Sequence, residues 1–342
     1  MKLAVVLFNL GGPDAPEAVE PFLRNLFSDP AIITLPAIAR LPLAWLIARR
    51  RAPIARRIYG HIGGRSPIFE ETRQQANALE KALSKDGLEA KAFVAMRYWH
   101  PFARGAAQAV KAFKPDKIVL LPLYPQYSTT TTASSLKDWA RAARKTRLEI
   151  PTSRICCYPW ETGFVTAACA KIREAMADAP QGVPYRLLLS AHGLPKRIVQ
   201  KGDPYQGQVE QSAAAIVKAL DMPGLEPVIC YQSRVGPLEW IGPATDAEII
   251  RAGKDGKGVI VAPIAFVSEH SETLVELDIE YRHLARESGV PDYRRAATVG
   301  THPDFIQGLA GLVRAALDSK TVTCGEGRLC PTRTKRCGYG EA

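Results

Sequence analysis

Two short apolar segments with the same pattern, one in each half of the chain, constrain the fold most strongly. Residues 118–123 have the sequence IVLLPL and residues 259–264 have VIVAPI, and each runs into a serine-containing turn before a predicted helix. A second pair repeats in the same way, with LFNLGGP at 7–13 and LSAHGLP at 189–195. Continuous apolar runs of this length are typical of parallel strands that are buried on both faces. The sequence therefore predicts two copies of one α/β unit.

Apolar strands and helices alternate over most of the chain, which is typical of α/β folds with parallel sheets flanked by helices. We predict two similar Rossmann-like domains, over residues 1–150 and 151–305, followed by a C-terminal helix and a cysteine-rich tail over 306–342. With 342 residues, 46% of them apolar, the chain can bury two cores. Doubly wound folds bind ligands beyond the carboxyl ends of their strands, so we expect the site in a cleft between the halves.

A row of carboxylates follows the second apolar run. A helix is predicted after residue 268, and its apolar face recurs at 3,4,3 spacing: Leu274, Leu277, Tyr281 and Leu284. A separate line carries a glutamate at every fourth position: Glu272, Glu276 and Glu280. Like charges at this spacing repel, and no lysine or arginine lies between residues 267 and 281 to relieve them. Either the row receives a cation or a proton, or the first carboxylates complement the helix N-terminus and the rest are solvated.

The predicted apolar strand at 187–190 ends at His192 and Gly193. A histidine in such a position is most often structural, but Glu272 opens the helix after another strand of the same half. An imidazole that titrates near neutral pH beside carboxylates is suited to removing protons from a weak N–H acid. The pattern therefore favours His192 as a proton acceptor with Glu272 as its partner.

Residues 32–58 combine many aliphatic side chains with six arginines, and prolines at 36, 42 and 53 are expected to break the stretch into short pieces. This stretch is either a core helix pair with a charged end or an apolar lip with a basic rim, which rests on a membrane or holds an apolar anion. The formal net charge of +11 implies an acidic partner. We expect no nucleic acid, because the basic residues adjoin an apolar stretch. Neither a secretion signal nor a transmembrane helix is expected.

Several motifs together resemble the ferrochelatase family, the terminal enzymes of haem synthesis. They are LFNLGGPD (7–14), GGRSPI (63–68), MRYWHP (96–101), LPLYPQYSTTTTASS (121–135), SAHGLPKRIVQKGDPY (190–205), YQSRVGPLEWIGP (231–243) and PIAFVSEHSETLVELDIEY (263–281). The resemblance covers about residues 3–317 and implies two Rossmann-like domains with a porphyrin cleft. The implied reaction inserts Fe2+ into protoporphyrin IX, giving haem b and two protons without an organic cofactor.

The resemblance also implies roles for individual residues. The proton-accepting pair would be His192 and Glu272. The residues that meet the metal would be His192, Glu272, Glu276 and Glu280. The residues that pack the macrocycle would be Leu10, Arg97, Tyr98, Trp240 and Phe266. The residues that hold the propionates would be Arg51, Tyr59 and Ser66. The stretch 32–58 matches the family's apolar lip, so we expect a cytoplasmic protein that is peripherally associated with the inner membrane.

Three of the seven cysteines lie in the glycine-rich tail: Cys324, Cys330 and Cys337. Such a tail has little reason to fold unaided, and its thiols suit either zinc or an iron–sulfur cluster. The fourth ligand would be Cys157, with Cys156 as the alternative. Some ferrochelatases carry a [2Fe-2S] cluster on a tail of this kind, and the resemblance implies a structural cluster here. In the animal enzymes the internal ligand falls in the QYS motif, where this chain has Thr129.

Two alternative functions remain open. A related chelatase would insert another metal or act on coproporphyrin III, whose four carboxylates call for more basic residues around the cleft. A haem carrier would need neither a proton acceptor nor an acidic row. The oligomeric state is open, and a homodimer is compatible with the sequence.

Overall fold

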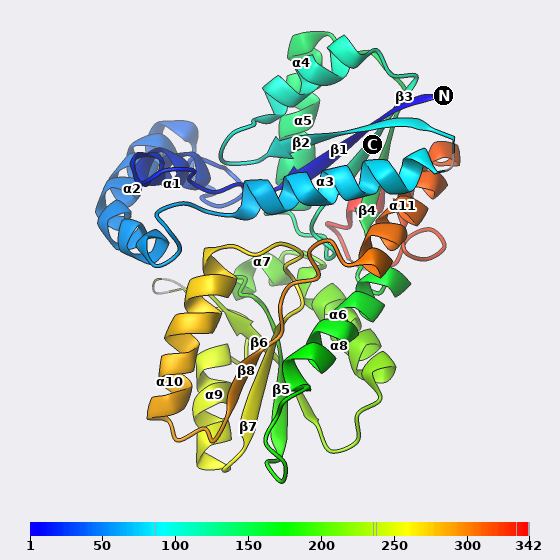
Figure 1. Ribbon diagram of the computed structural model, residues 1–342. Helices are drawn as coiled ribbons and strands as arrows, with labels where there is room; N and C mark the ends of the chain where they lie inside the picture. Colours follow the sequence, from blue (N-terminus) through cyan, green and yellow to red (C-terminus); the bar gives the residue numbers. More distant parts are fainter. Residues whose placement is uncertain (86, 235, 237, 333, 341–342) are drawn as a thin grey trace. The chain divides into compact units, whose positions relative to one another are not determined.

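The structure, a computed structural model, describes residues 1–85, 87–234, 236, 238–332 and 334–340, and it divides into two compact units (Figure 1). Unit 1 consists of Met1–Cys157 and Leu309–Thr323, and unit 2 of Tyr158–Gly308 and Cys324–Ala342. Each unit contains a parallel sheet flanked by helices, so the predicted α/β class is confirmed.

Unit 1 is built on a five-stranded sheet in the order β2-β1-β3-β4-β9. Its strands are β1 (Lys2–Asn9), β2 (Glu89–Met96), β3 (Lys117–Pro122), β4 (Thr152–Cys157) and β9 (Thr321–Thr323). Its helices are η1 (Pro16–Ala18), α1 (Val19–Phe27), α2 (Ala37–Gly60), α3 (Ile68–Ser84), α4 (Ala103–Phe113) and α5 (Thr132–Thr146), and α11 (Pro303–Asp318) runs from unit 2 into unit 1.

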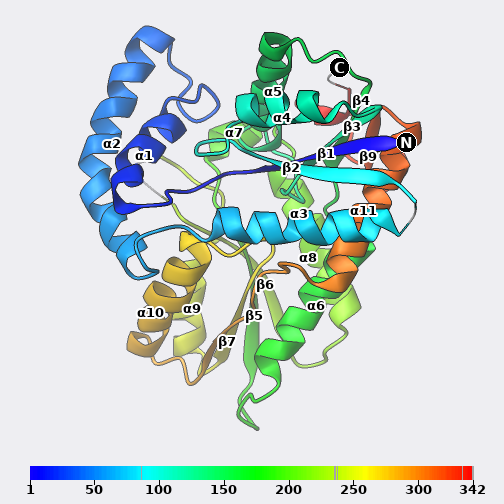
Figure 2. The ribbon, with the colours of Figure 1, turned by 45° about the horizontal axis from the view of Figure 1, so that its top comes forward.

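The central strand β1 is buried on both faces, as its apolar run predicts. Phe8 packs against Trp139 of α5 with ring centroids 6.0 Å apart, in a cluster that α4 completes. On the opposite face the Nδ2 of Asn9 donates to Thr72 of α3 at 3.0 Å. Within unit 1, α3 therefore covers one face of the sheet while α4 and α5 cover the other (Figure 2).

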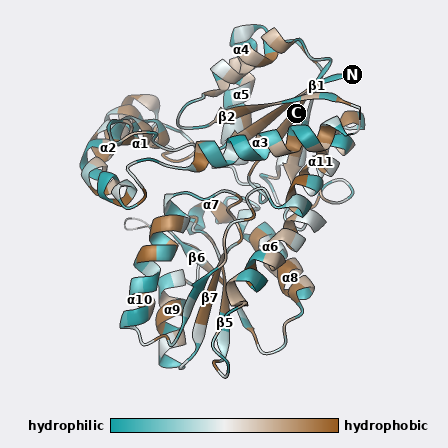
Figure 3. Ribbon diagram, in the orientation of Figure 1, coloured by the Kyte–Doolittle hydropathy of each residue, from teal (hydrophilic) through white to brown (hydrophobic). Residues whose placement is uncertain are grey.

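Unit 2 is built on a four-stranded sheet in the order β6-β5-β7-β8. Its strands are β5 (Tyr185–His192), β6 (Glu226–Gln232), β7 (Gly258–Pro263) and β8 (Tyr293–Arg295). Its helices are α6 (Thr162–Met176), α7 (Lys196–Gln200), α8 (Tyr205–Leu220), α9 (Thr245–Lys254), the π-helix η2 (Glu272–Glu280), α10 (Tyr281–Glu287) and the short η3 (Gly338–Gly340). Apolar residues of β5, β6 and β7 form one core with α9, η2 and α10. Strand β7 is coloured mainly as hydrophobic in Figure 3.

The internal repeat is confirmed by strand order and by register. In both units the first strand lies between the second and the third, and the fourth follows the third. Phe8 pairs with Pro122 in unit 1, and Ser190 pairs with Pro263 in unit 2. These are the positions that the two sequence repeats place in correspondence. In the same correspondence Leu10 stands where unit 2 has His192.

The boundary between the units differs from the predicted one at residue 150. The segment 152–157 is β4, which pairs with β3 and so completes the first sheet. The tail was expected to lack regular structure, yet its first residues form β9, which pairs with β4 across a register shift between Ile155 and Cys157. This edge position gives residues 321–323 backbone partners that the tail sequence alone does not predict.

The stretch 37–60 is one continuous helix, α2, and the prediction that its prolines break it is wrong. A proline inside a helix costs about 3 kcal/mol, and Pro42 and Pro53 both lie inside α2. The compensation is a buried face at helical spacing, Ala44, Ala48, Ala52 and Tyr59, part of which packs in one cluster with α1. Among the described residues, every helix is too short or too polar to span a bilayer.

The acidic helix also differs from the prediction. Residues 272–280 form a π-helix, with one more residue in each hydrogen-bonded ring than an α-helix. Its buried residues are Thr273, Val275 and Leu277, so Leu274 does not belong to the buried face that the 3,4,3 spacing predicts. The remaining three apolar positions of that face do pack in the unit 2 core, because α10 restores α-helical spacing.

Candidate functional site

His192 and Glu272 come together at the carboxyl edge of the unit 2 sheet. His192 is the last residue of β5, and Glu272 is the first residue of η2, which follows the neighbouring strand β7. The Nδ1 of His192 lies 2.8 Å from the Oε2 of Glu272. Strand order reverses between β5 and β7, and the ends of such strands form the usual binding site of doubly wound folds.

The two side chains shift each other's protonation. Burial lowers the pKa of His192, but the carboxylate of Glu272 outweighs it, so the pKa lies above 6.5. Burial raises the pKa of Glu272, but the imidazole outweighs it and brings that pKa to about 2. The ring of His192 is 42% exposed and meets Phe266 edge-on, with centroids 6.4 Å apart. Tyr205 donates to the carbonyl of His192 at 3.1 Å and helps to hold the strand end.

Glu276 is held beside Glu272 by two residues that follow each other at the end of β6. The Nε2 of Gln232 donates to Glu276 at 3.2 Å, and the backbone N–H of Ser233 donates to it at 2.8 Å. The hydroxyl of Ser233 lies 3.2 Å from Glu272 and 2.5 Å from Glu276, and its single proton can be given to only one of them at a time. Burial and the charge of Glu272 raise the pKa of Glu276.

Other residues of unit 2 lie around this pair. His270 is buried with its Nε2 3.9 Å from Glu272, and burial lowers its pKa, so its imidazole is neutral near pH 7. Trp240 packs on the glycine after His192: a Cβ added at Gly193 would lie 3.2 Å from the indole. Glu280 is exposed at the far end of η2. The acidic row therefore runs from the inside of the site to the surface.

From the sequence, no role was assigned to Gln232 or Ser233. Gln232 is the end of β6, directly beside His192 in the sheet register. Its Oε1 accepts from Ser190 at 2.8 Å, which fixes the amide so that its NH2 points at η2. The sequence signal that could have identified Gln232 is a polar residue at the end of a strand next to the one that ends in His192.

In unit 1, the predicted residues Arg97 and Tyr98 both bind Asp29, which the sequence did not single out. Arg97 NH2 and the Tyr98 hydroxyl each lie 2.8 Å from its Oδ2, and Ser134 donates to the same oxygen. Asp29 accepts the N–H of Ala31 at 2.9 Å through its other oxygen. Burial raises the pKa of Asp29, but these donors outweigh it and the pKa falls below 3.8. Tyr98 is only 1% exposed, so its ring lies beneath the surface.

The other predicted residues of unit 1 lie in two places. Leu10 and Tyr59 pack with Tyr98 in the cluster formed by α1 and α2. Arg51 is exposed on α2, with its guanidinium 5.8 Å from a phenylalanine ring of α1. Ser66 packs on the turn after β1. A Cβ added at Gly12 in that turn would lie 2.5 Å from the Cβ of Ser66.

The cysteines predicted to bind an iron–sulfur cluster belong to two different units. Cys156 and Cys157 are buried on β4 of unit 1, whereas the three tail cysteines belong to unit 2. A hydrogen bond from Cys330 lowers the pKa of Cys337, and burial raises that of Cys324 to about 11. Over the described part of the chain, no three cysteine, histidine or acidic side chains converge as a metal site. Of the predicted ligands, Cys330 and Cys337 therefore lie together in unit 2.

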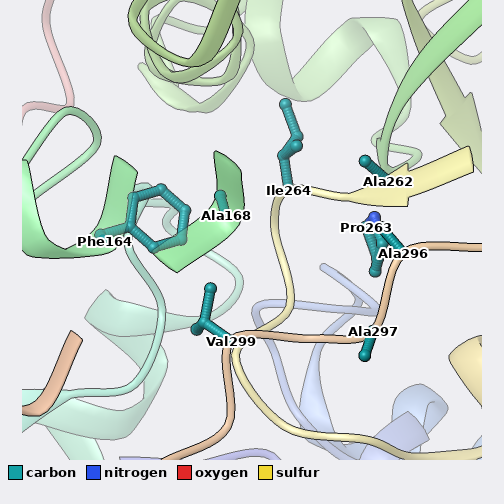
Figure 4. Close-up of a pocket in the computed structure, with 8 residues that line it drawn as sticks. All are labelled: Phe164, Ala168, Ala262, Pro263, Ile264, Ala296, Ala297 and Val299. Carbon is teal, nitrogen blue, oxygen red and sulfur yellow. The ribbon is translucent and has the colours of Figure 1, made fainter. Parts of the chain in front are cut away.

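A small apolar pocket lies elsewhere in unit 2 (Figure 4). It is lined by Phe164, Ala168, Ala262, Pro263, Ile264, Ala296, Ala297 and Val299. None of the predicted site residues lines it, and its wall offers no charged group. We therefore assign the chemistry to the His192 and Glu272 edge.

The chain is similar to known proteins over nearly its whole length. The family model described as Ferrochelatase matches residues 2–317. A ferrochelatase of Phenylobacterium zucineum is 56% identical over 98% of each chain, and one of Caulobacter vibrioides is 53% identical over 98% of this chain and 97% of the other.

Solved structures give the fold independently. The structure of SirB from Bacillus subtilis with Fe3+ has a TM-score of 0.53 at 14% identity and covers 92% of this chain and 96% of its own. The sirohydrochlorin chelatase SirB of the subspecies spizizenii, in complex with cobalt, also has a TM-score of 0.53. The family model and the relatives cover nearly the whole length, and the chain belongs to the ferrochelatase family.

Proposed function

We propose that this ferrochelatase inserts Fe2+ into protoporphyrin IX and releases two protons, the terminal step of haem b synthesis. The observation that carries the proposal is the 2.8 Å contact between His192 and Glu272 at the strand ends of unit 2. As a member of its family the chain is a metal chelatase, a lyase. The identity of the porphyrin and the role of each residue are what we propose.

His192 accepts the pyrrole protons. Glu272 accepts a hydrogen bond from Nδ1, so the lone pair remains on Nε2. The carboxylate stabilises the imidazolium that forms, which is why the pKa of His192 is raised. Each pyrrole N–H bond breaks as the nitrogen turns to the metal, and its proton passes to Nε2.

The acidic row takes the proton onward and receives the iron. The Ser233 hydroxyl lies within hydrogen-bond distance of both Glu272 and Glu276. It can relay a proton by giving its own proton to one carboxylate while its oxygen takes a proton from the other, and it then rotates back. The residues proposed to meet the metal are His192, Glu272, Glu276 and Glu280. Carboxylate oxygen and imidazole nitrogen are both ligands that a divalent iron accepts.

We propose apolar and basic side chains as the groups that hold the porphyrin. Phe266 and Trp240 border His192 and offer flat apolar surface, which suits a macrocycle. From unit 1 we propose Leu10, Arg51, Tyr59, Ser66 and Arg97, with the arginines directed to carboxylates. Because Tyr98 is buried, its role is to hold Asp29 and thereby Arg97.

The direct test is an anaerobic assay of the purified protein with Fe2+ and one porphyrin at a time. Loss of the free-porphyrin Soret band with protoporphyrin IX, and slower conversion of coproporphyrin III, is the expected result. Faster conversion of coproporphyrin III would assign that substrate instead. Binding of either porphyrin without conversion would favour a carrier.

Peripheral membrane association rests on the outer face of α2. Ile38 is 88% exposed, Leu41 51% and Trp45 46%, and the guanidinium of Arg49 lies 5.4 Å from the Trp45 ring. Apolar side chains with arginines beside them gain from both acyl chains and anionic head groups. We infer that the protein works in the cytoplasm at the inner membrane. Sedimentation of the purified protein tests whether it is also a homodimer.

We also propose that the tail binds an iron–sulfur cluster. The support is the hydrogen-bonded pair Cys330 and Cys337 together with the lowered pKa of Cys337, since a thiolate is the form that binds metal. Cys324 and Cys157 would complete the set, with Cys156 as the alternative to Cys157. Such a cluster would tie the tail to the body and take no part in proton transfer.

We expect anaerobically purified protein to contain iron and acid-labile sulfide. Both should be lost in Cys330→Ser and in Cys337→Ser. Bound zinc without sulfide would replace the cluster by a zinc site. Protein with neither would remove the proposal.

A further inference from the structure

The π-helix η2 carries Glu272, so whatever holds its unusual form also decides where that carboxylate points. An α-helix is the default for a sequence of this kind, and a π-helix differs from it by one residue per hydrogen-bonded ring. A change from one form to the other rotates the residues after the change relative to those before it. The far end of η2 runs directly into α10, whose apolar side chains are fixed in the unit 2 core.

One guanidinium binds residues on both sides of Glu272. Arg295 ends strand β8, and its Nε lies 3.0 Å from Oδ1 of Asp278 while its Nη2 lies 2.5 Å from Oδ2. Its Nη1 lies 2.7 Å from Oε1 of Glu269, which also accepts the N–H of Thr298 at 2.9 Å. Glu269 precedes η2 and Asp278 lies near its end.

The donors of a guanidinium lie in one plane in a fixed fork. Because Arg295 is only 11% exposed, water screens its two contacts weakly. The group therefore fixes the spacing between positions 269 and 278, and with it the number of residues per turn between them.

A second contact from the same strand supports this interpretation. The hydroxyl of Tyr293, two residues before Arg295 on the same face, donates to the carbonyl of Leu277 at 2.7 Å. Arg282 of α10 in turn donates to the carbonyl of Tyr293 at 3.0 Å. The three-residue edge strand β8 thus binds η2 and its continuation through side chains.

We propose that Arg295 is a positioning residue for iron insertion, which holds residues 269–278 in the π-helical form that places Glu272 opposite His192. The proposal rests on the proposed chelatase function for its effect on turnover. Its effect on η2 does not depend on any porphyrin. The two can therefore fail separately.

The chain contains a matched control one residue away. Arg294 points to the opposite face of β8, where its Nε lies 2.5 Å from Asp292 and its NH1 and NH2 bind the carbonyls of Ala175 and Asp178 at the end of α6. It is buried to a similar degree, 15% exposed against 11%. Loss of either arginine removes an ion-pair network from the same strand, but only Arg295 binds η2 and the segment before it.

The first test is steady-state kinetics with protoporphyrin IX and Fe2+. Arg295→Gln should lower kcat about tenfold, the scale typical of residues that orient a metal-binding group, and leave KM for the porphyrin nearly unchanged. Arg295→Lys should recover part of the loss, because an ammonium can bind one of the two carboxylates but cannot bridge both as the planar guanidinium does. Arg294→Gln should keep the wild-type kcat. An unchanged kcat in Arg295→Gln, or an equal loss in Arg294→Gln, would overturn the proposal.

The second test needs no porphyrin. Amide hydrogen exchange over residues 272–280 should become faster in Arg295→Gln than in Arg294→Gln, and equal exchange would overturn the proposal. If Arg295→Gln does not fold, Arg295→Lys decides, since a folded Lys variant with wild-type kcat and exchange refutes the positioning role. If the wild-type protein inserts no iron, the proposed function fails while the exchange experiment still decides whether Arg295 holds η2.

Discussion

The Nδ1 of His192 faces the Oε2 of Glu272 at 2.8 Å, although 80 positions separate them in the chain. The strand order of unit 2 brings them together, because β5 and β7 are neighbours and end at the same edge. The contact also orients the ring, which leaves Nε2 as the basic nitrogen.

His192→Ala should abolish iron insertion in a protein that still folds and binds porphyrin. We expect a loss of at least about 100-fold, the low end of what a positioned acid or base contributes. His283→Ala is the control, since that imidazole is exposed on α10 and pairs only with Glu287 in the described contacts. Soret absorbance measures both binding and turnover. A His192→Ala enzyme with more than a few per cent of wild-type activity would contradict the proton-acceptor role.

The three glutamates of the acidic row should differ in importance. Glu272→Gln should cost about 100-fold or more in kcat, because it removes the charge that stabilises the imidazolium of His192. Glu276→Gln and Glu280→Gln should cost about tenfold or less and act mainly on the dependence on iron concentration. Kinetics at varied Fe2+ separates these effects. Equal and negligible losses for all three would make the row a solvated helix face.

Turnover should rise with pH along a limb whose midpoint lies above pH 6.5. Burial lowers the pKa of His192 and Glu272 raises it more, so the neutral, proton-accepting form appears only above that value. In Glu272→Gln the raising charge is gone, and the midpoint should move to lower pH. Profiles of kcat/KM against pH for both proteins measure the shift, because this ratio reports the pKa values of the free enzyme. An unmoved midpoint would show that another group controls the limb.

The stabilisation of the fold by the His192 and Glu272 pair should be lost at both low and high pH. The contribution of Glu272, whose pKa is depressed from 4.5 to about 2, is complete above pH 4.5 and is lost as the pH falls toward 2. The contribution of His192, whose pKa is raised, is complete below pH 6.5 and is lost as the pH rises through the raised value. Thermal unfolding of Glu272→Gln relative to wild type should therefore differ most between pH 4.5 and 6.5.

The repeated strands could be predicted from the sequence because a parallel strand buried on both faces leaves a local trace. Phe8 and Ser190 occupy equivalent register positions, as the aligned segments predict. The π-helix could not be predicted from its own segment, since Arg295 and Tyr293, which bind it, come after it in the chain. Asp29 was missed for the same reason: its partner Arg97 is 68 positions away, and neither local segment marks the contact.

Replacing Ile38, Trp45 and Leu46 together by serine should release the protein from anionic liposomes. These three side chains are exposed on α2, so the change removes apolar contact without opening a core. Ile250→Ser in unit 2, where the side chain is 37% exposed, controls for a general loss of surface hydrophobicity. Co-sedimentation measures the binding. If the triple variant sediments like wild type, α2 is not the membrane contact.

Asp29→Asn should weaken both unit 1 and the proposed grip on the porphyrin. Asp29 lies between α1 and α2, and its Oδ2 accepts from Arg97, Tyr98 and Ser134, so it ties the base of the helix pair to the end of β2. The Arg97 and Asp29 side chains are 13% and 3% exposed, and breaking a buried ion pair costs about 3–5 kcal/mol. Urea unfolding should show this loss.

An amide at position 29 keeps the shape but removes the charge that holds the guanidinium, so Arg97 should lose its fixed orientation. KM for the porphyrin should then rise more than kcat falls, which separates this variant from Glu272→Gln. Asp138→Asn is the control, because its carboxylate lies 4.0 Å from the same arginine and is more exposed. If Asp29→Asn loses stability while KM stays at the wild-type value, Arg97 is a structural partner of Asp29 and does not bind the substrate.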